Sequence, residues 1–158
     1  MRIRFLVLAW ILSLNFSTYA QDDETQILAT VDKFFAALNE HDIDALREVT
    51  VDDTLHISTR RVEGATSFSI RNNEELVIAF STSTGSAWLE RYWDETVLIR
   101  EDIAVFWAPY DFHIGGNFSH CGIDSFQLLK RDGVWLLSNM SWTMETENCP
   151  TSPLGPVN

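Results

Sequence analysis

The sequence predicts a single α+β domain in which N-terminal helices pack on one face of an antiparallel sheet. Two patterns indicate this fold class. Apolar residues recur at helical spacing over residues 25–40, and from residue 87 onward apolar and polar residues alternate in runs separated by turn sequences. The chain has 158 residues, of which 46% are hydrophobic, so it is long enough to bury a core without a structural metal.

The N-terminus has the features of a signal peptide. Arg2 and Arg4 precede the apolar run 5–14, and the small residue Ala20 suits cleavage before Gln21. The run is shorter than the roughly 20 residues that span a bilayer, so we expect cleavage rather than an uncleaved anchor. The mature protein should then be free of the membrane and periplasmic or secreted. We expect a signal peptide at 1–20, one domain at 21–149 and an irregular tail at 150–158.

Three helices are expected before the main sheet. Residues 25–40 carry one apolar stripe that includes Val31 and Leu38. Asp42 can cap a short second helix that ends at Val49, and Asn72-Asn73 opens a third.

The strands follow from alternation and from turn residues. Thr54–Ser58 favours β structure, whereas residues 60–72 show no clear periodicity. Glycine-containing turns at Gly115-Gly116 and Asp132-Gly133 separate long strands. The sequence therefore predicts a four-stranded antiparallel meander at 87–99, 103–114, 117–130 and 134–145.

The two glycine turns predict which side chains share a face, if each is a two-residue turn. Trp107 then lies opposite Asp124 and Asp111 opposite His120, on one face whose further members are Phe126, Leu128, Trp135, Leu137, Asn139 and Ser141. This face is apolar at one end and polar at the other, which is typical of a pocket beneath covering helices. A one-residue bulge would reverse these assignments. In the strand 87–99, Arg91 points into the pocket if the following turn at 100–102 has three residues, and Tyr92 does if it has two.

The opposite face is expected to carry Cys121, Ile123, Met140, Trp142 and Met144. It is too apolar for bare solvent, so we expect a subunit interface and a homodimer, with burial under the tail as the alternative.

Cys121 and Cys149 are the only cysteines, and an exported protein experiences an oxidising compartment. A disulfide between them is the favoured interpretation, and two buried thiols are the alternative. No spacing of cysteine or histidine indicates a metal site, and no cofactor motif is present.

The order of helices and strands, with four sequence stretches, resembles the nuclear transport factor 2-like superfamily, which includes ketosteroid isomerases and SnoaL-like enzymes. The resemblance implies a cone-shaped α+β barrel with a ligand cavity. It is nearest to the exported bacterial branch called lumazine-binding-like. The stretches that carry it are ERYWD at 90–94, WAPYDF at 107–112, HCGIDSF at 120–126 and GVW at 133–135.

Asp124 is the first candidate for chemistry, since a carboxyl group beside Trp107 and Phe126 would be partly desolvated and suited to act as a general base. A structural acid in a hydrogen-bond network is the alternative. His120 and Asp111 could assist as an acid–imidazole pair, or form a solvated cross-strand pair. The candidate ligand-binding residues are Trp107, Phe126, Asn139, Ser141, Arg91 and His56.

A formal net charge of −12 argues against nucleic acid as a partner. Three functions remain. The first is an exported domain that binds a small, partly apolar molecule. The second is an isomerase or lyase that uses Asp124 as general base. The third is a dimerisation module with a filled cavity.

Overall fold

The structure is a computed structural model that describes residues 15–62, 64–82 and 86–157. Residues 1–14, which make up most of the expected signal peptide, lie outside the described residues. The first helix, α1 (Asn15–Glu40), begins before the stretch predicted as helical. Within the described residues, no helix is both long and apolar enough to cross a bilayer.

Two shorter helices follow, α2 (Ile43–Val49) and α3 (Asn73–Thr82). The Asp42 carboxylate accepts a hydrogen bond from the Ala45 backbone N–H and so caps α2, as predicted. At the start of α3, the side chain of Asn72 accepts from the Glu75 N–H while the Glu75 carboxylate accepts from the Asn72 N–H. This reciprocal capping fixes where the preceding strand turns into the helix.

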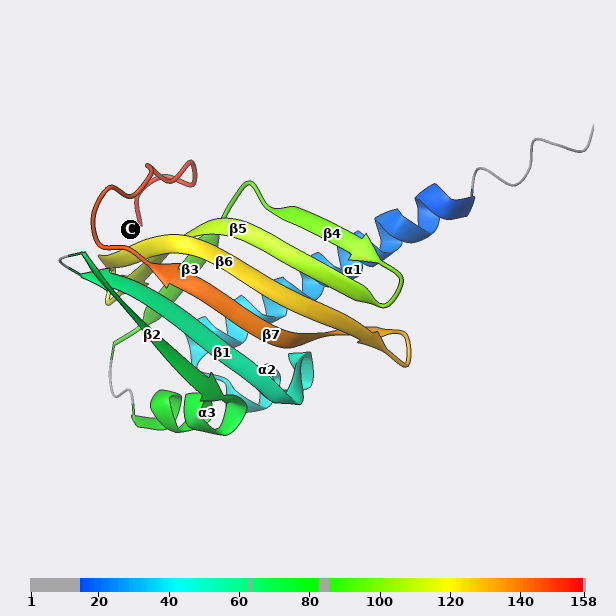
Figure 1. The fold of residues 1–158 in the computed structure, drawn as a ribbon, viewed down its shortest axis with the longest axis horizontal. Helices are drawn as coiled ribbons and strands as arrows, with labels where there is room; N and C mark the ends of the chain where they lie inside the picture. Colours follow the sequence, from blue (N-terminus) through cyan, green and yellow to red (C-terminus); the bar gives the residue numbers. More distant parts are fainter. Residues whose placement is uncertain (1–14, 63, 83–85, 158) are drawn as a thin grey trace, which may run out of the picture.

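The sheet has the strand order β2-β1-β7-β6-β5-β3, and β4 also pairs with β5 (Figure 1). β1 runs parallel to β7, and the other neighbouring strands of the described sheet pair antiparallel. The strands are β1 (Thr50–Val62), β2 (Ala65–Asn72), β3 (Trp88–Tyr92), β4 (Thr96–Arg100), β5 (Ile103–Ile114), β6 (Asn117–Arg131) and β7 (Val134–Met144).

Two parts of the sheet differ from the prediction. Residues 60–72, which lack clear periodicity, belong to the β1–β2 hairpin, and the apolar residues of β2 are exposed, so they leave no buried alternation. The strand predicted at 87–99 is interrupted after β3. Asp94 has a left-handed φ of 47°, which breaks the extended backbone, and the chain resumes pairing only in β4.

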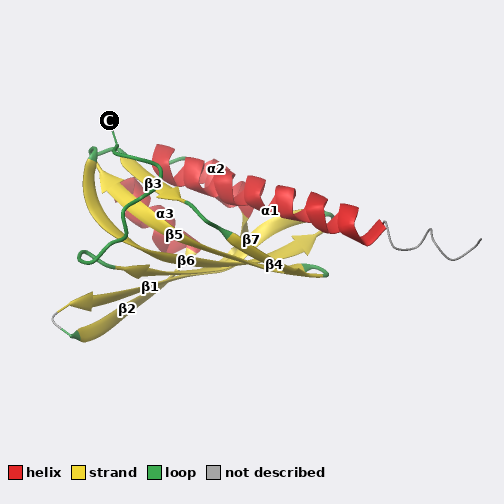
Figure 2. Cartoon of the chain, turned by 90° about the horizontal axis from the view of Figure 1, so that it is seen from above, coloured by secondary structure: helices red, strands yellow, loops and turns green. Residues whose placement is uncertain are grey.

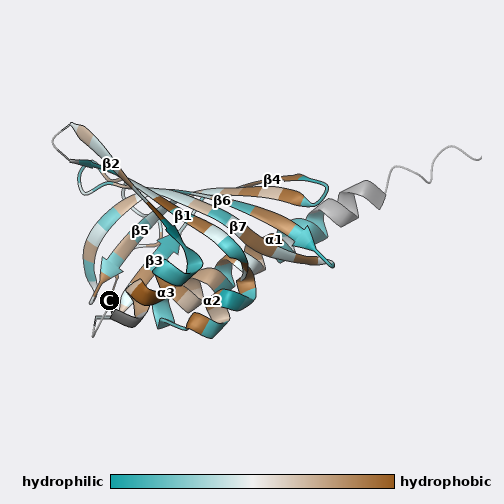
Figure 3. Cartoon of the chain, turned by 60° about the horizontal axis from the view of Figure 1, so that its bottom comes forward, coloured by the Kyte–Doolittle hydropathy of each residue, from teal (hydrophilic) through white to brown (hydrophobic). Residues whose placement is uncertain are grey.

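All three helices lie on one face of the curved sheet, here called the inner face (Figure 2). The face turned away from them is the outer face. Apolar positions of α1 and the inner face of the strands make the core, where Ile27, Val31 and Leu137 are fully buried (Figure 3). Near the turn between β6 and β7, Lys130 and the Trp135 indole both donate to the Asp23 carboxylate and so connect α1 to the sheet.

Two β-bulges determine which side chains face inward. Phe112 pairs with His120 and His113 with Phe118, so Ser119 is an extra residue in β6. Gln127 pairs with Asn139 and Leu128 with Leu137, so Ser138 is an extra residue in β7. Beyond each bulge, the side chains therefore point to the face of the sheet opposite to the one that uninterrupted pairing from the turn would give.

The outer face near the β3 end is covered by the C-terminal tail (Figure 1). Cys121 and Cys149 form a disulfide, which confirms the favoured interpretation of the two cysteines. The Arg91 guanidinium donates to the Gly155 carbonyl, and this contact holds the far part of the tail in place.

Candidate functional site

A cavity of about 460 Å³ lies between the inner face and helices α1 and α3. That volume is within the range typical of small-molecule sites. Its floor is largely aromatic and aliphatic, and its rim carries arginine and serine side chains. The apolar lining includes Phe34, Leu76, Phe80, Trp88, Phe112, Phe126, Met140 and Trp142.

Glu90 from β3 and Asp124 from β6 meet in this cavity. Their carboxyl groups are close enough to act on each other's ionisation, and two carboxyl groups can share a hydrogen bond only if one of them carries a proton. Asp124 is 1% exposed, and its Oδ2 has no hydrogen-bond partner among the described residues. The pair therefore offers one polar atom to whatever occupies the cavity.

Burial favours the protonated form of both carboxyl groups. Burial raises the pKa of Asp124 well above its usual value, and the charge of Glu90 adds to the shift. Burial likewise raises the pKa of Glu90, to about 8, with a further contribution from the charge of Asp111. Near neutral pH the two carboxyl groups hold at least one proton between them.

Two histidines of the cavity wall are held in the neutral form. Burial and the nearby charge of Arg60 lower the pKa of His120 to about 4, and its ring stacks on Phe112 with centroids 4.9 Å apart. Burial lowers the pKa of His56, which lies 2.6 Å from the Asn73 Oδ1 through its Nε2. The Asn73 amide group donates to Thr50 and Val51, so its oxygen accepts and the His56 Nε2 donates.

Asp111 lies in a separate cluster on the outer face. The Arg91 guanidinium makes two hydrogen bonds to its carboxylate, at 2.9 and 2.6 Å, and the His113 Nε2 lies 3.4 Å from the Asp111 Oδ1. Burial opposes ionisation of Asp111, but its hydrogen bonds and charge interaction with Arg91 outweigh that effect and lower its pKa. This carboxylate is fully partnered, and it lies beneath the tail rather than in the cavity.

The structure brings four of the predicted site residues to the cavity: Asp124, His120, Phe126 and His56. The predicted inward facing is wrong for the others. The Ser119 bulge places Trp107 opposite Ser125 and Asp111 opposite Cys121, so both point outward, and Trp107 is 50% exposed. Arg91 lies opposite Asp111 and also points outward.

The Ser138 bulge has the same effect in β7. Asn139 and Ser141 pair with Gln127 and Ser125 on the outer face. Met140, Trp142 and Met144, which were expected on the opposite face, line the cavity instead. The expected cross-strand pair of His120 with Asp111 does not form, because the two side chains lie on opposite faces.

Sequence reasoning missed Glu90, Arg60 and Arg71, all of which line the cavity. A signal for Glu90 was present, because Trp88 and Tyr92 flank it at the spacing of one strand face. The two arginines lie in the hairpin that showed no periodicity, so nothing assigned them a face.

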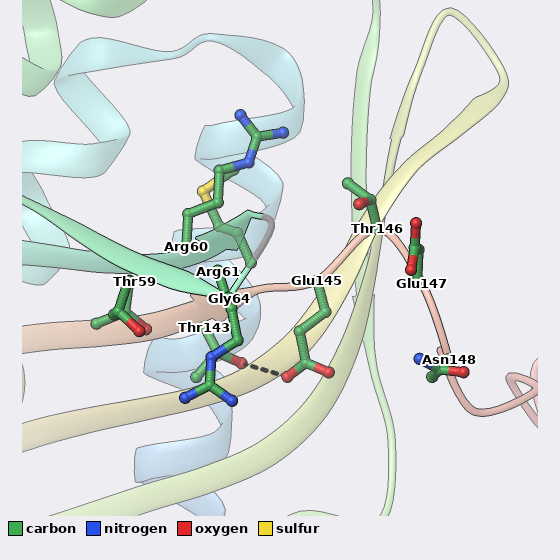
Figure 4. A pocket seen from close by; sticks show the side chains of 11 residues that line it. Thr59, Arg60, Arg61, Gly64, Thr143, Glu145, Thr146, Glu147 and Asn148 are labelled. Carbon is green, nitrogen blue, oxygen red and sulfur yellow. Dashed lines mark hydrogen bonds between the residues drawn. The ribbon is translucent and has the colours of Figure 1, made fainter.

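A second hollow lies between the tip of the β1–β2 hairpin and the start of the tail (Figure 4). Its lining is mostly polar, with Thr59, Arg61 and Glu145, and the Thr143 hydroxyl donates to Glu145. Figure 4 shows the neighbouring side chains of Arg60 and Arg61 pointing in opposite directions. Arg61 belongs to this outer hollow, whereas Arg60 borders both hollows.

The sequence matches no family model, and no curated protein matches it either. Solved structures do match. A nuclear transport factor 2-like protein from Cytophaga hutchinsonii superposes with a TM-score of 0.62 at 21% identity, covering 78% of this chain and 98% of that one. A second nuclear transport factor 2-like protein, from Novosphingobium aromaticivorans and with a cystatin-like fold, superposes with a TM-score of 0.65 at 14% identity. The match covers 89% of this chain and 94% of that one.

A third match is described as a dehydratase of the same family, from Streptomyces avermitilis. Its TM-score is 0.61 at 12% identity, with 79% of this chain and 97% of that one covered. At identities this low, the similarity shows the fold alone, and the chemistry has to be inferred from the residues of the site. The chain has the nuclear transport factor 2-like cone fold, with its helices packed on a curved, mainly antiparallel sheet.

Proposed function

We propose that this protein binds a small, largely apolar molecule in the cavity beneath α1 and α3. One observation carries the proposal. The cavity joins an apolar wall to a buried acidic pair, Glu90 and Asp124, and the Asp124 Oδ2 has no hydrogen-bond partner among the described residues. A buried polar atom without a partner is costly, and a ligand with one hydroxyl or carbonyl group would satisfy it.

The neutral dye N-phenylnaphthylamine, which fluoresces in apolar surroundings, tests the proposal by titration. Ser58→Trp places a large ring in the cavity from β1, and Thr59→Trp places the same ring on the outer face. We expect the unmodified protein and Thr59→Trp to bind one dye per chain. Ser58→Trp should weaken binding about ten-fold or more, which is at least about 1.4 kcal/mol. Equal binding by both variants would contradict the proposal.

A second candidate function is proton-transfer catalysis of the isomerase or lyase type. It is favoured by the shared proton of Glu90 and Asp124, because a carboxyl group that titrates near neutral pH can both donate and accept a proton. Asp124→Asn separates the two functions. For a binding protein it leaves the affinity for N-phenylnaphthylamine nearly unchanged, because this dye has no hydroxyl or carbonyl group for the carboxyl pair, and there is no turnover to lose. For an enzyme it lowers kcat far more than affinity.

Export and dimerisation are further proposals. The residues Arg2, Arg4 and Ala20 support a cleaved signal peptide, and the mass of the mature protein tests it. The exposed outer face carries Leu98 and Trp107 and supports a homodimer. Sedimentation at micromolar concentration tests this, and a monomer alone would contradict it. Kinship with the lumazine-binding-like branch stays a prediction.

A further inference from the structure

The cavity rim carries positive charge that its wall does not balance. Arg60 from β1 and Arg71 from β2 both line the cavity, and neither has an ion-pair partner among the described residues. The acidic groups of the lining are Glu90 and Asp124, which retain a proton between them near neutral pH. The site is therefore cationic in a chain whose formal net charge is −12.

The pairing of the hairpin places the two arginines around a small polar patch. Arg71 lies opposite His56 and Arg60 opposite Ser67, and the pair Ser58–Ser69 lies between them. Four residues of strand separate the two arginine positions, which is about 13 Å. Long side chains from both ends can approach a group held over the two serine hydroxyls.

The effect of Arg60 on a histidine of the cavity wall supports this arrangement. The charge of Arg60 is felt by His120, which is 7% exposed, so this guanidinium acts on the cavity interior and not only on solvent. Guanidinium groups bind carboxylate, sulfonate and phosphate oxygens through paired N–H donors. Serine hydroxyls at Ser58 and Ser69 add further donors along the same rim.

We propose that the ligand is a small amphipathic organic anion, whose apolar body lies on the aromatic floor and whose anionic group lies between Arg60 and Arg71. This inference rests on the proposed function and specifies its ligand class. The anionic end faces the open rim and the apolar end lies toward Phe126 and Met140. An inverted ligand would bring its negative charge next to the carboxyl pair, where no cation of the lining compensates it.

Two dyes with the same ring system test the inference. Anilinonaphthalene sulfonate carries one sulfonate, and N-phenylnaphthylamine has the rings without it. We expect the unmodified protein to bind the sulfonate at least about ten-fold more tightly, and this preference to shrink as salt is added. The double change Arg60→Gln with Arg71→Gln should remove most of the preference and leave the affinity for the neutral dye unchanged. Both arginines are exposed, so we expect the variants to fold.

Arg61→Gln is the matched control, because Arg61 is the next residue of β1 and belongs to the outer hollow. It should change neither affinity. Ser58→Trp should weaken both dyes, which shows that they occupy the cavity. A sulfonate preference that survives the double change, or an equal loss in Arg61→Gln, would overturn the inference. Binding of the neutral dye without any sulfonate preference would overturn the inference alone. Failure of both dyes to bind would overturn the proposed function as well.

Discussion

Two aspartates on neighbouring strands have pKa values that are shifted in opposite directions. Asp111 on β5 faces outward, where Arg91 binds it and lowers its pKa. Asp124 on β6 faces inward, where its partner is Glu90 and its pKa is raised. Both residues are buried, so burial alone does not explain the difference. The charge of the partner does.

The edge strand β3 supplies both partners. Glu90 and Arg91 are consecutive, and because successive side chains of a strand alternate, they reach opposite faces of the sheet. The outer pair is an ion pair that stabilises the fold. The inner pair is an acidic pair that costs stability when it ionises, and carboxyl groups with pKa values raised in this way cluster at functional sites.

Breaking the outer pair should have the largest effect. Arg91→Leu leaves the buried Asp111 carboxylate without its guanidinium and should lower the free energy of unfolding by about 3 kcal/mol. Urea denaturation at pH 7 measures it. Arg100→Leu, which changes an exposed arginine on β4, should cost less than about 0.5 kcal/mol. Similar losses in both variants would mean that the ion pair is not responsible.

Removing the disulfide should affect the outer face and spare the cavity. Replacing Cys121 and Cys149 together by serine opens a loop whose ends are 28 residues apart and should cost about 3 kcal/mol. The affinity for N-phenylnaphthylamine should remain unchanged. If the double variant lost dye binding while it was still fully folded, the tail and the cavity would be coupled.

The two aspartates should give opposite pH dependences of stability. The raised pKa values of Asp124 and Glu90 stabilise the fold below their unfolded values near 4, and this stabilisation is lost as the pH rises toward about 8. Asp124→Asn removes the repulsion, so relative to the unmodified protein it should gain about 2 kcal/mol between pH 5 and pH 9. Chemical denaturation across that range measures the difference.

Asp111→Asn is the matched comparison. The lowered pKa of Asp111 stabilises the fold above its unfolded value near 4, and that contribution is lost on acidification through the folded pKa. This variant should therefore be most destabilised near pH 6 and approach the unmodified protein at pH 3. If the free energy of unfolding changed with pH in the same direction in both variants, the assignment of opposite environments to Asp111 and Asp124 would be contradicted.

The smallest effect is expected on the outer surface. Trp107→Ser should change the stability of the monomer by less than about 1 kcal/mol, because half of the side chain is already exposed. Trp142→Ser, on the cavity wall, should cost more and weaken dye binding. If Trp107 contributes to a dimer, its substitution should shift sedimentation toward the monomer.

The sequence predicted the fold class, the three helices and the inward facing of Asp124 and Phe126. These followed from apolar periodicity and from two glycine turns. The same reasoning failed for Trp107, Asn139 and Ser141, because it extended the turn registers along the strands past the bulges at Ser119 and Ser138. A bulge leaves no fixed residue signature, so pairing alone could not locate it.

Apolar alternation within each strand was the better guide. In β5 the buried apolar residues are Ala104, Phe106, Ala108, Tyr110 and Phe112, which form one unbroken face. That pattern alone would have placed Trp107 and Asp111 outside. Glu90 could have been assigned from Trp88 and Tyr92 in the same way. The arginines of the β1–β2 hairpin could not, since little of that hairpin is buried.

The most direct test of this account is a carbon-detected NMR titration of the side-chain carboxyl groups of Asp111, Glu90 and Asp124. We predict that the inner pair keeps at least one proton up to a pH of about 8, whereas Asp111 is ionised throughout the range above its usual pKa. Asp124→Asn should leave a single inner titration, that of Glu90, and should not lower its pKa, because Asp124 lowers the pKa of Glu90 in the unmodified protein. Ionisation of both inner carboxyl groups below pH 5 would contradict the shared proton, and with it the polar centre on which the proposed ligand site depends.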